Sequence, residues 1–383
     1  MDSVIEFLER REAIYLQRLR KLVDTNSGLD NPAGRLACLE QLQKIYEQLG
    51  FRCERIERPG DMVHLLATRP SKRPGALKVM ILGHFDTVYD STSGFLSYQE
   101  QGKWLGGPGV GDMKGGLVVA QAALDALHHA CKLDDFDWVC LHNADEEIQS
   151  PTSRDLIEKY AVGRDVALDF EIGRKTGAVV RSRSGVGRFF VTVRGKAAHA
   201  GMDHNAGVNA IVGMAKIVLQ LAELTDASQG TTVNVGVIKG GTKRNVVPDE
   251  AKVEVDVRVL TLAEGARIEQ RIREICAQPP LPGAKAEVIG NIGRPPWQRN
   301  AECDRVIAHF QAIADHYGVP LGAEDTGGGS DANFTAALGI PSIDGLGPVG
   351  EQPHTHEERI QKHTVVERAK LVALALLHWP APD

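Results

Sequence analysis

Three short apolar runs constrain the fold of this chain more than any other feature. They cover residues 77–82, 138–141 and 166–170, and a stretch of helical periodicity at residues 115–130 separates the first two. Apolar runs of this length that alternate with helices are typical of an α/β sheet with parallel pairs. In such a sheet, binding and catalytic residues lie at the strand ends and in the loops that follow them.

The order of the predicted elements changes in the middle of the chain, where it becomes typical of a compact α+β unit. The elements there are strand 188–194, helix 205–224, strands 232–238 and 251–259, helix 262–276 and strand 285–289. Helical periodicity at residues 4–22 and 33–49 precedes this unit, and helical and short strand patterns at residues 301–317, 333–337 and 364–377 follow it. We therefore predict a discontinuous catalytic domain, residues 1–178 and 294–383, into which an α+β domain of residues 179–293 is inserted.

Charge and cysteine content exclude several classes of protein. The formal net charge is −6 and the basic residues form no long run, so neither nucleic acid nor an anionic membrane is an expected partner. The six cysteines include no C-x-x-C pair, which argues against a zinc ribbon and favours reduced thiols. The N-terminal segment has no uninterrupted apolar stretch of the kind found in signal peptides and membrane spans. These features predict a cytoplasmic protein.

Histidine and acidic residues follow the first two predicted strands. A strand projects alternate side chains to one side, so His84 and Asp86 can face the same space, with the imidazole as a metal ligand and the carboxylate as its orienting partner. Three consecutive acids, Asp145, Glu146 and Glu147, follow the second strand and repel each other unless a cation intervenes. One of these glutamates could bind a metal while its neighbour acts as a general base.

Three further segments supply ligands of the same kind. The glycine-rich segment 106–116 contains Asp112, which could bridge two cations, and lacks the G-x-x-x-x-G-K-[ST] pattern of a phosphate-binding loop. Asp169 and Glu171 flank the end of the third strand, and register alone permits either as a ligand. A late group, residues 354–358, reads HTHEE. Histidine and carboxylate at three strand ends and two loops form the ligand set of a divalent metal.

Ten motifs occur in one order along nearly the whole chain: GHFDTV, GVGDMKGG, ADEE, DFEIG, GKAAHAG, NVVP, VDVR, GRPP, GGGSDA and HTHEE. Together they resemble the M20 metallopeptidase family, and within it the carboxypeptidase G-like branch of glutamate carboxypeptidases. The resemblance implies a phosphorylase/hydrolase-like zinc peptidase catalytic domain with a mixed sheet, and an inserted ferredoxin-like lid and dimerisation domain.

The resemblance also implies a dinuclear metal site. Its ligands would be His84, Asp112 as the bridge, Glu147, Glu171 and His354. The family's alignment favours Glu171 over Asp169, and its spacing favours His354 over His356. The cofactor would be two Zn²⁺ per chain, with Co²⁺ or Mn²⁺ as substitutes, because ligand softness does not separate these metals. In this family the Asp112–Met113 peptide is expected to be cis.

Catalytic roles follow from the same resemblance. Glu146 would be the general base that deprotonates a water bridging the metals and passes the proton to the leaving amine, and Asp86 would orient His84. His199 would reach the partner's active site across a homodimer and stabilise the oxyanion. The substrate-binding residues would be Asn245, Arg258, Arg294, Gly329 and Ser330.

One departure from the branch concerns substrate specificity. Its glutamate-cleaving members place a lysine after the glutamate ligand, whereas residues 173–178 here read GRKTGA and are one residue shorter. Lys175, Arg181 or Arg183 would have to substitute, so a preference for an acidic side chain does not follow automatically. Recognition of an α-carboxylate by guanidinium groups remains physically reasonable.

The predicted function is hydrolysis of the C-terminal amide bond of an N-acyl or peptidyl amino acid, with C-terminal glutamate favoured. The partners would be this small substrate and a second copy of the chain, bound through the lid domain. The nearest alternative is an aminoacylase- or desuccinylase-type amidohydrolase with a non-glutamate substrate. A non-catalytic binding protein is a weaker alternative, because the predicted base and all five predicted ligands are present.

Overall fold

The computed structural model describes residues 2–319 and 321–380, which divide into two compact units. Unit 1 comprises the described residues of Met1–Arg181, Arg299–Asp325 and Ser330–Asp383. Unit 2 comprises Ser182–Gln298 and Thr326–Gly329. The chain therefore passes from unit 1 into unit 2 and back to unit 1 twice.

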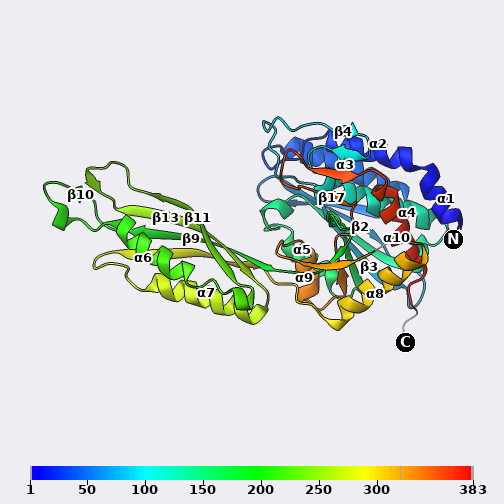
Figure 1. The fold of residues 1–383 in the computed structure, drawn as a ribbon. Coiled ribbons are helices and arrows are strands. Elements are labelled where there is room, and N and C mark those ends of the chain that lie inside the picture. Colours follow the sequence, from blue (N-terminus) through cyan, green and yellow to red (C-terminus); the bar gives the residue numbers. More distant parts are fainter. Residues whose placement is uncertain (1, 320, 381–383) are drawn as a thin grey trace. The chain divides into compact units, whose positions relative to one another are not determined.

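Unit 1 is built on a six-stranded mixed sheet (Figure 1). The strands, in sheet order, are β1 (Arg52–Arg58), β2 (Met62–Arg69), β6 (Phe136–Asn143), β3 (Leu77–His84), β7 (Val166–Asp169) and β16 (Ser342–Ile343). β3 runs parallel to β6 and β7, and β16 runs parallel to β7. The hairpin β1–β2 joins β6 in the antiparallel sense. The predicted α/β class with a mixed sheet is confirmed.

The strand register brings polar residues together at one edge of this sheet. His84, the last residue of β3, pairs with Asn143, the last residue of β6. On the other side of β3, Leu82 pairs with Asp169, the last residue of β7. Parallel strands that end in register release their following loops into one region. The residues after β3, β6 and β7 therefore share this edge.

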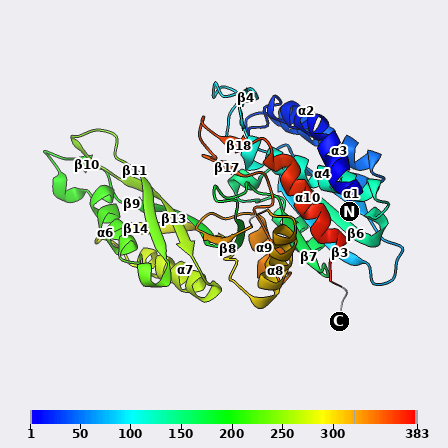
Figure 2. The same cartoon turned by 45° about the vertical axis from the view of Figure 1, so that its right-hand side comes forward.

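Helices cover both faces of the sheet (Figure 2). Alternate residues of β3 point to opposite sides, so Val79 and Ile81 pack into one hydrophobic cluster while Met80 and Leu82 pack into another. The first cluster includes residues of α1 (Asp2–Arg10), α2 (Glu12–Val23), α3 (Pro32–Gln48), α4 (Gly115–His129), α8 (Ala301–His316) and α10 (Thr364–Leu377). The second includes residues of α5 (Arg154–Ala161) and α9 (Ala332–Ala337).

The N-terminal helix expected at residues 4–22 is two helices, α1 and α2. The backbone leaves the helical region at Arg11, which has φ −106° and ψ 4°. The apolar periodicity continues across this break because Leu8, Tyr15 and Leu19 are all buried in the same cluster. A periodic pattern reports which side of a segment is buried, so it does not register a break that leaves that side unchanged.

Two smaller sheets complete unit 1 and its connections. A four-stranded sheet has the order β17 (Gly350–Glu351), β18 (Arg359–Gln361), β5 (Trp104–Gly106) and β4 (Gln99–Gln101). A two-stranded sheet consists of β15 (Ala323–Thr326) and β8 (Val179–Arg183). None of the helices within residues 2–319 and 321–380 is both long and apolar enough to cross a membrane.

Unit 2 is a four-stranded antiparallel sheet covered on one face by two helices. The strand order is β11 (Thr232–Gly240), β13 (Glu250–Val259), β9 (Gly185–Arg194) and β14 (Lys285–Arg294). The helices are α6 (Ala210–Ala222) and α7 (Leu262–Ala277), and a short pair, β10 (Ala198–His199) and β12 (Val246–Val247), lies outside the main sheet. The chain order βαββαβ with this strand order is ferredoxin-like, as predicted.

The helix expected at residues 205–224 begins later, at Ala210. The Asn209 side chain accepts a hydrogen bond from the backbone N–H of Val212 and so caps α6. The preceding residues His204–Ala206 form a separate 3₁₀ turn. The cap fixes the start of the helix after that turn.

Candidate metal centre

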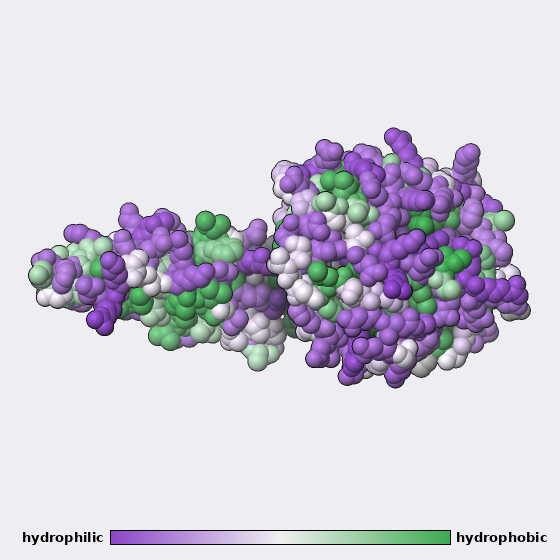
Figure 3. Space-filling model, turned by 90° about the horizontal axis from the view of Figure 1, so that it is seen from above, coloured by the Kyte–Doolittle hydropathy of each residue, from purple (hydrophilic) through white to green (hydrophobic). Residues whose placement is uncertain are grey.

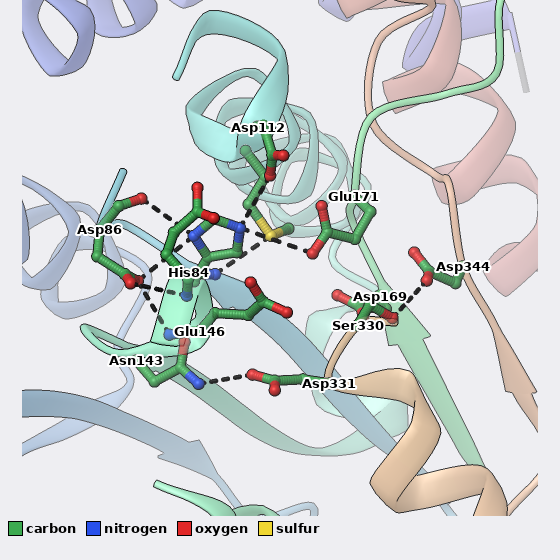
Figure 4. Close-up of polar contacts among 12 residues, drawn as sticks. His84, Asp86, Asp112, Asn143, Glu146, Asp169, Glu171, Ser330, Asp331 and Asp344 are labelled. Atoms are coloured by element: carbon green, nitrogen blue, oxygen red, sulfur yellow. Dashed lines mark hydrogen bonds and ion pairs between the residues drawn. The ribbon is translucent and has the colours of Figure 1, made fainter. Parts of the chain in front are cut away.

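The centre of the site is His84 at the carboxyl end of β3 (Figure 4). Its Nε2 atom lies 3.0 Å from Oδ1 of Asp112 and 3.6 Å from Oε1 of Glu171. Its Nδ1 atom lies 3.1 Å from the carbonyl oxygen of Asp86 and 3.4 Å from the Asp86 carboxylate. Nδ1 faces Asp86, whereas Nε2 faces the carboxylates of two predicted metal ligands. We therefore assign the proton of the neutral ring to Nδ1, which leaves Nε2 as the nitrogen that can bind a metal.

Asp86 has a second contact that the sequence did not reveal. Its carboxylate accepts hydrogen bonds from the backbone N–H groups of Glu146, at 3.3 Å, and Glu147, at 3.0 Å. These two glutamates begin a 3₁₀ turn, Glu146–Ile148, directly after β6. One buried carboxylate therefore orients the imidazole and also fixes the turn that carries the predicted base and a predicted ligand.

Asp112 lies in the glycine-rich loop before α4, where the Asp112–Met113 peptide is cis, as expected. Its carboxylate lies between two imidazoles, with Oδ1 facing His84 and Oδ2 lying 3.1 Å from Nε2 of His354. His354 comes from the loop between β17 and β18, where it has φ 62°. Its Nε2 atom is also 3.2 Å from Oε2 of Glu147.

These side chains form two groups that could each hold a metal ion. One group is His84, Glu146 and Glu171, and the other is His84, Asp112 and Glu147; within each group the ligand atoms lie within 4.8 Å of one another. His354 contacts the second group through Asp112 and Glu147. The structure therefore brings together all five residues predicted as ligands and the predicted base.

Electrostatics also favour a cation at this site. Burial, together with the charge of Asp112, raises the pKa of Glu147 to about 8 and that of Glu171 well above its ordinary value. The hydrogen bonds to Asp112 and Glu147 raise the pKa of His354 to about 11. Burial lowers the pKa of His84, but its hydrogen bonds to Asp112 and Asp86 outweigh burial and raise it well above the ordinary value. Without a metal ion, the glutamates and histidines of the cluster therefore hold protons. A bound cation would replace those protons and stabilise the charge of the carboxylates.

One buried atom tests whether a metal fits. Oε1 of Glu147 is buried and has no hydrogen-bond partner among the described residues, and the Glu147 side chain is only 5% exposed. A buried carboxylate oxygen without a donor is costly unless a cation binds it. The surrounding donors are imidazole nitrogen and carboxylate oxygen, which suit Zn²⁺, Co²⁺ and Mn²⁺ alike. The residues present therefore fit a divalent metal.

A layer of buried hydrogen bonds supports the turn at Glu146. The Asp145 carboxylate accepts from the Thr152 hydroxyl at 2.7 Å and from the Ser153 hydroxyl at 2.6 Å. Asn143 donates to Ser153 at 2.9 Å and to Asp331 at 2.5 Å. Sequence reasoning predicted none of these hydrogen bonds, because residue types alone do not identify the partners of a side chain and Asp331 lies on a distant segment.

The residues predicted to bind substrate lie mostly in unit 2. His199 and Asn245 are exposed, and Nδ1 of His199 accepts from the backbone N–H groups of Gly201 and Met202. Arg258 makes a two-pronged ion pair with Asp256, and Arg294 is buried. A side chain at Gly329 would meet Cδ of Arg294 at 2.8 Å. Ser330, in unit 1, donates its hydroxyl to Asp344 at 2.7 Å.

The three candidates for the missing lysine differ in their partners. Lys175 pairs with Glu351 at 2.9 Å, and Arg181 pairs with Asp325 at 3.0 Å. Arg183 is buried and donates to the carbonyl oxygen of Gly328 at 3.0 Å. Gly328 belongs to the same short segment as Gly329, so Arg183 and Arg294 both contact that segment in unit 2.

A mixed α/β unit with a histidine–carboxylate cluster at its strand ends, together with a ferredoxin-like insertion, defines a metal-dependent hydrolase. Residues 181–284 match the peptidase dimerisation domain of the M20 family. The chain is 30% identical to carboxypeptidase G2 of Pseudomonas sp. (strain RS-16), over 94% of this chain and 88% of that protein. It is 26% identical to succinyl-diaminopimelate desuccinylase of Paracidovorax citrulli, over 86% and 88% of the two chains.

A solved structure supports the fold. A dinuclear metal binding peptidase of the M20 family from Bacillus subtilis superposes with a TM-score of 0.69 at 16% identity, covering 99% of this chain and all of that one. The chain therefore belongs to the M20 metallopeptidase family and is a hydrolase, either a metallopeptidase or an amidohydrolase. The predicted resemblance is confirmed.

The contact of α4 with the strand end before Glu171 gives a testable prediction. A Cβ at Gly116 would lie 1.7 Å from the backbone oxygen of Phe170, the residue before Glu171. Gly116→Ala should displace Glu171 and weaken Zn²⁺ binding by about 10- to 100-fold. The measurement is the dissociation constant for Zn²⁺ added to the metal-free protein. Gly265→Ala in α7 is the matched control, because its Cβ would meet only ordinary contacts at 3.5 Å and beyond. Equal affinities in the two variants would contradict the prediction.

Proposed function

We propose that this chain is a dinuclear zinc hydrolase that cleaves the C-terminal amide bond of an N-acyl or peptidyl amino acid, with C-terminal glutamate as the favoured leaving group. The observation that carries the proposal is the convergence of His84 and the four other predicted ligands, with Glu146 in one of the two groups. Metal-assisted hydrolysis uses a metal site with a base next to it, and this arrangement of side chains supports both roles.

The proposed roles follow the contacts of each side chain. His84, Asp112, Glu147, Glu171 and His354 would hold two metal ions, with Asp112 between them. When bound, the metals would polarise the amide carbonyl and activate water. Glu146 would take the proton of that water and pass it to the leaving amine, a role supported by its place in the same turn as the proposed ligand Glu147. Asp86 would keep His84 in the required tautomer.

Substrate recognition is proposed for residues of unit 2 and the segment that returns from it. Arg258 and Arg294 would bind the substrate carboxylate, Asn245, Gly329 and Ser330 would be further substrate-binding residues, and His199 of a partner chain would stabilise the oxyanion. Similarity to a carboxypeptidase G2 supports cleavage of a C-terminal amide bond, and the preference for glutamate rests on the resemblance of the motifs. Similarity to desuccinylases favours the alternative, an amidohydrolase with another acyl group.

The domain boundaries and cellular location are proposed on separate grounds. Residues 1–178 and 294–383 would form the catalytic domain, and residues 179–293 the lid and dimerisation domain. No disulfide bond joins the six cysteines, all of which lie among the described residues, and this supports a reducing compartment such as the cytoplasm.

A homodimer through unit 2 is proposed from its surface. β11 is an edge strand, and Ile238 on it is opposite Val253, whose side chain is buried on the helix-covered face. Ile238 therefore lies on the same face as α6, which packs against β11 and exposes Ile211 and Leu219. Exposed apolar side chains are visible on unit 2 in Figure 3. An unpaired strand edge beside apolar side chains suits pairing with a second copy.

Charge placed on this edge tests the dimer. Ile238, 58% exposed on β11, and Ile289, 73% exposed on the opposite edge strand β14, form a matched pair. Ile238→Lys should convert the dimer to monomer, because a lysine on an edge strand opposes pairing, whereas Ile289→Lys should leave it unchanged. Light scattering coupled to size-exclusion chromatography measures both masses. A monomeric wild-type protein, or dissociation only by Ile289→Lys, would refute the proposed interface.

Separating base from ligand tests the mechanism. Glu146→Ala should lower kcat by about 10²- to 10⁴-fold while the protein keeps its metal, because it removes a proton acceptor. His84→Ala should lose metal as well, since its Nε2 atom contacts both groups. Elemental analysis and steady-state kinetics on the same samples give both quantities. Near-normal kcat in Glu146→Ala would exclude Glu146 as the base.

Metal removal and a substrate panel test the reaction class. The purified protein should contain about two zinc ions per chain and release glutamate from N-acyl-glutamates faster than other amino acids from matched compounds. Dialysis against a chelator should abolish activity, and Zn²⁺, Co²⁺ or Mn²⁺ should restore it. Preferential hydrolysis of N-succinyl amines would instead support the desuccinylase-type alternative. A metal-loaded protein inactive on every compound would favour the non-catalytic reading.

A further inference from the structure

A buried carboxylate that no proposed role includes lies against the loop that carries Asp112. Glu358 is 1% exposed. Its Oε1 atom accepts hydrogen bonds from the backbone N–H groups of Gly111, at 2.7 Å, and Asp112, at 3.0 Å. Its Oε2 atom accepts from the N–H of Gly109 at 3.3 Å. Three backbone donors of one irregular loop are therefore satisfied by a single side chain.

Tyr89 connects this carboxylate to the segment that carries His354. Its hydroxyl lies 2.7 Å from Oε2 of Glu358 and 2.7 Å from the carbonyl oxygen of Thr355. The tyrosine ring packs edge-on against Phe95 at a centroid distance of 5.0 Å. Tyr89 itself comes from the loop after β3, which also carries Asp86. Three loops that supply the metal centre thus meet at one buried hydrogen-bond cluster.

Backbone pairing explains why Glu358 is available at this position. In the four-stranded sheet, Arg359 of β18 pairs with Gly106 of β5. Glu358 is the residue before β18, so it lies next to the point where the chain leaves β5 at residue 107 and continues into the Asp112 loop. His354 lies four residues before Glu358 on the same segment. The register of β18 and β5 brings two ligands that are 242 residues apart in the sequence to the same carboxylate.

We propose that Glu358, assisted by Tyr89, is a positioning residue that sets the geometry between the metal ligands Asp112 and His354. Glu358 itself touches neither a metal ligand atom nor the proposed base; it holds the backbone N–H of Asp112, whose carboxylate contacts both imidazoles. The inference rests on the proposed metal centre and extends it to a side chain outside the ligand set. Hydrogen bonds behind metal ligands commonly change metal affinity by 10- to 100-fold.

Four variants separate positioning from general stability. Glu358→Ala removes all the acceptors, and Tyr89→Phe removes only the hydroxyl bridge and keeps the ring. Glu358→Gln is the conservative change, because its oxygen can still accept from Gly111 and Asp112. Its amide can donate to the Tyr89 oxygen, and only the longer bond from Gly109, at 3.3 Å, loses its acceptor. Glu357→Ala is the matched control, since Glu357 is the exposed neighbour of Glu358.

The measurement is Zn²⁺ affinity of each metal-free protein by competition with a chelating dye, together with its melting temperature in the absence of metal. We expect Glu358→Ala to weaken Zn²⁺ binding by about 10- to 100-fold and Tyr89→Phe by a smaller factor. Glu358→Gln should remain within a few-fold of wild type, and Glu357→Ala should be indistinguishable from it.

Each outcome bears on a different statement. A lower melting temperature with unchanged Zn²⁺ affinity in Glu358→Ala means a structural role only and overturns the proposal. If Glu358→Ala does not fold, Tyr89→Phe decides: unchanged affinity overturns the proposal, and weakened affinity at an unchanged melting temperature supports it. A wild-type protein that binds no Zn²⁺ refutes the metal centre itself, which is distinguishable from failure of the positioning role.

Discussion

Like charges held close together in a buried place are the constraint on which this site depends. Asp112, Glu147 and Glu171 surround His84, and burial would be unfavourable for three carboxylates without a compensating cation. Because of this unfavourable burial, the pKa values of Glu147 and Glu171 are raised, so both side chains bind protons more readily than free glutamate. The surrounding structure has to hold these carboxylates close together against their mutual repulsion. The packed sheet and the hydrogen bonds to backbone amides hold them in place.

The support comes largely from carboxylates that accept backbone N–H groups. Asp86 holds the amides of Glu146 and Glu147, and Glu358 holds those of Gly111 and Asp112. Charge-assisted bonds of this kind are stronger than neutral ones and fix the backbone directly. The turn that carries Glu147 and the loop that carries Asp112 are therefore each constrained by an acid from another segment. The site is held by its neighbours in space more than by its own local sequence.

This explains how much of the fold and of the site could be predicted. Strands β3, β6 and β7 were recognisable because they are apolar on both faces, whereas β1 was not, because its sequence RCERIER lies exposed at a sheet edge. The candidate ligands could be predicted because histidine and acidic residues follow the ends of the predicted strands. The choice between His354 and His356 came only from family spacing, and in the structure His354 contacts Asp112 while His356 stacks on Phe95. The contacts of Glu358 and Tyr89 could not be predicted from the sequence, because their partners are backbone groups of distant loops.

The two units also divide the proposed chemistry. All five proposed ligands and the proposed base belong to unit 1, whereas Arg258 and Arg294 belong to unit 2. Lys175 and Arg181, two of the candidates for a missing lysine, are engaged by Glu351 and Asp325, and both lie outside unit 2. Arg183 and Arg294 are instead buried beside the segment of Gly328 and Gly329. Under the proposed roles, changes in unit 2 would alter which carboxylate or acyl group is recognised without disturbing the proposed metal ligands. Such a division is consistent with one family containing both carboxypeptidases and desuccinylases among the relatives of this chain.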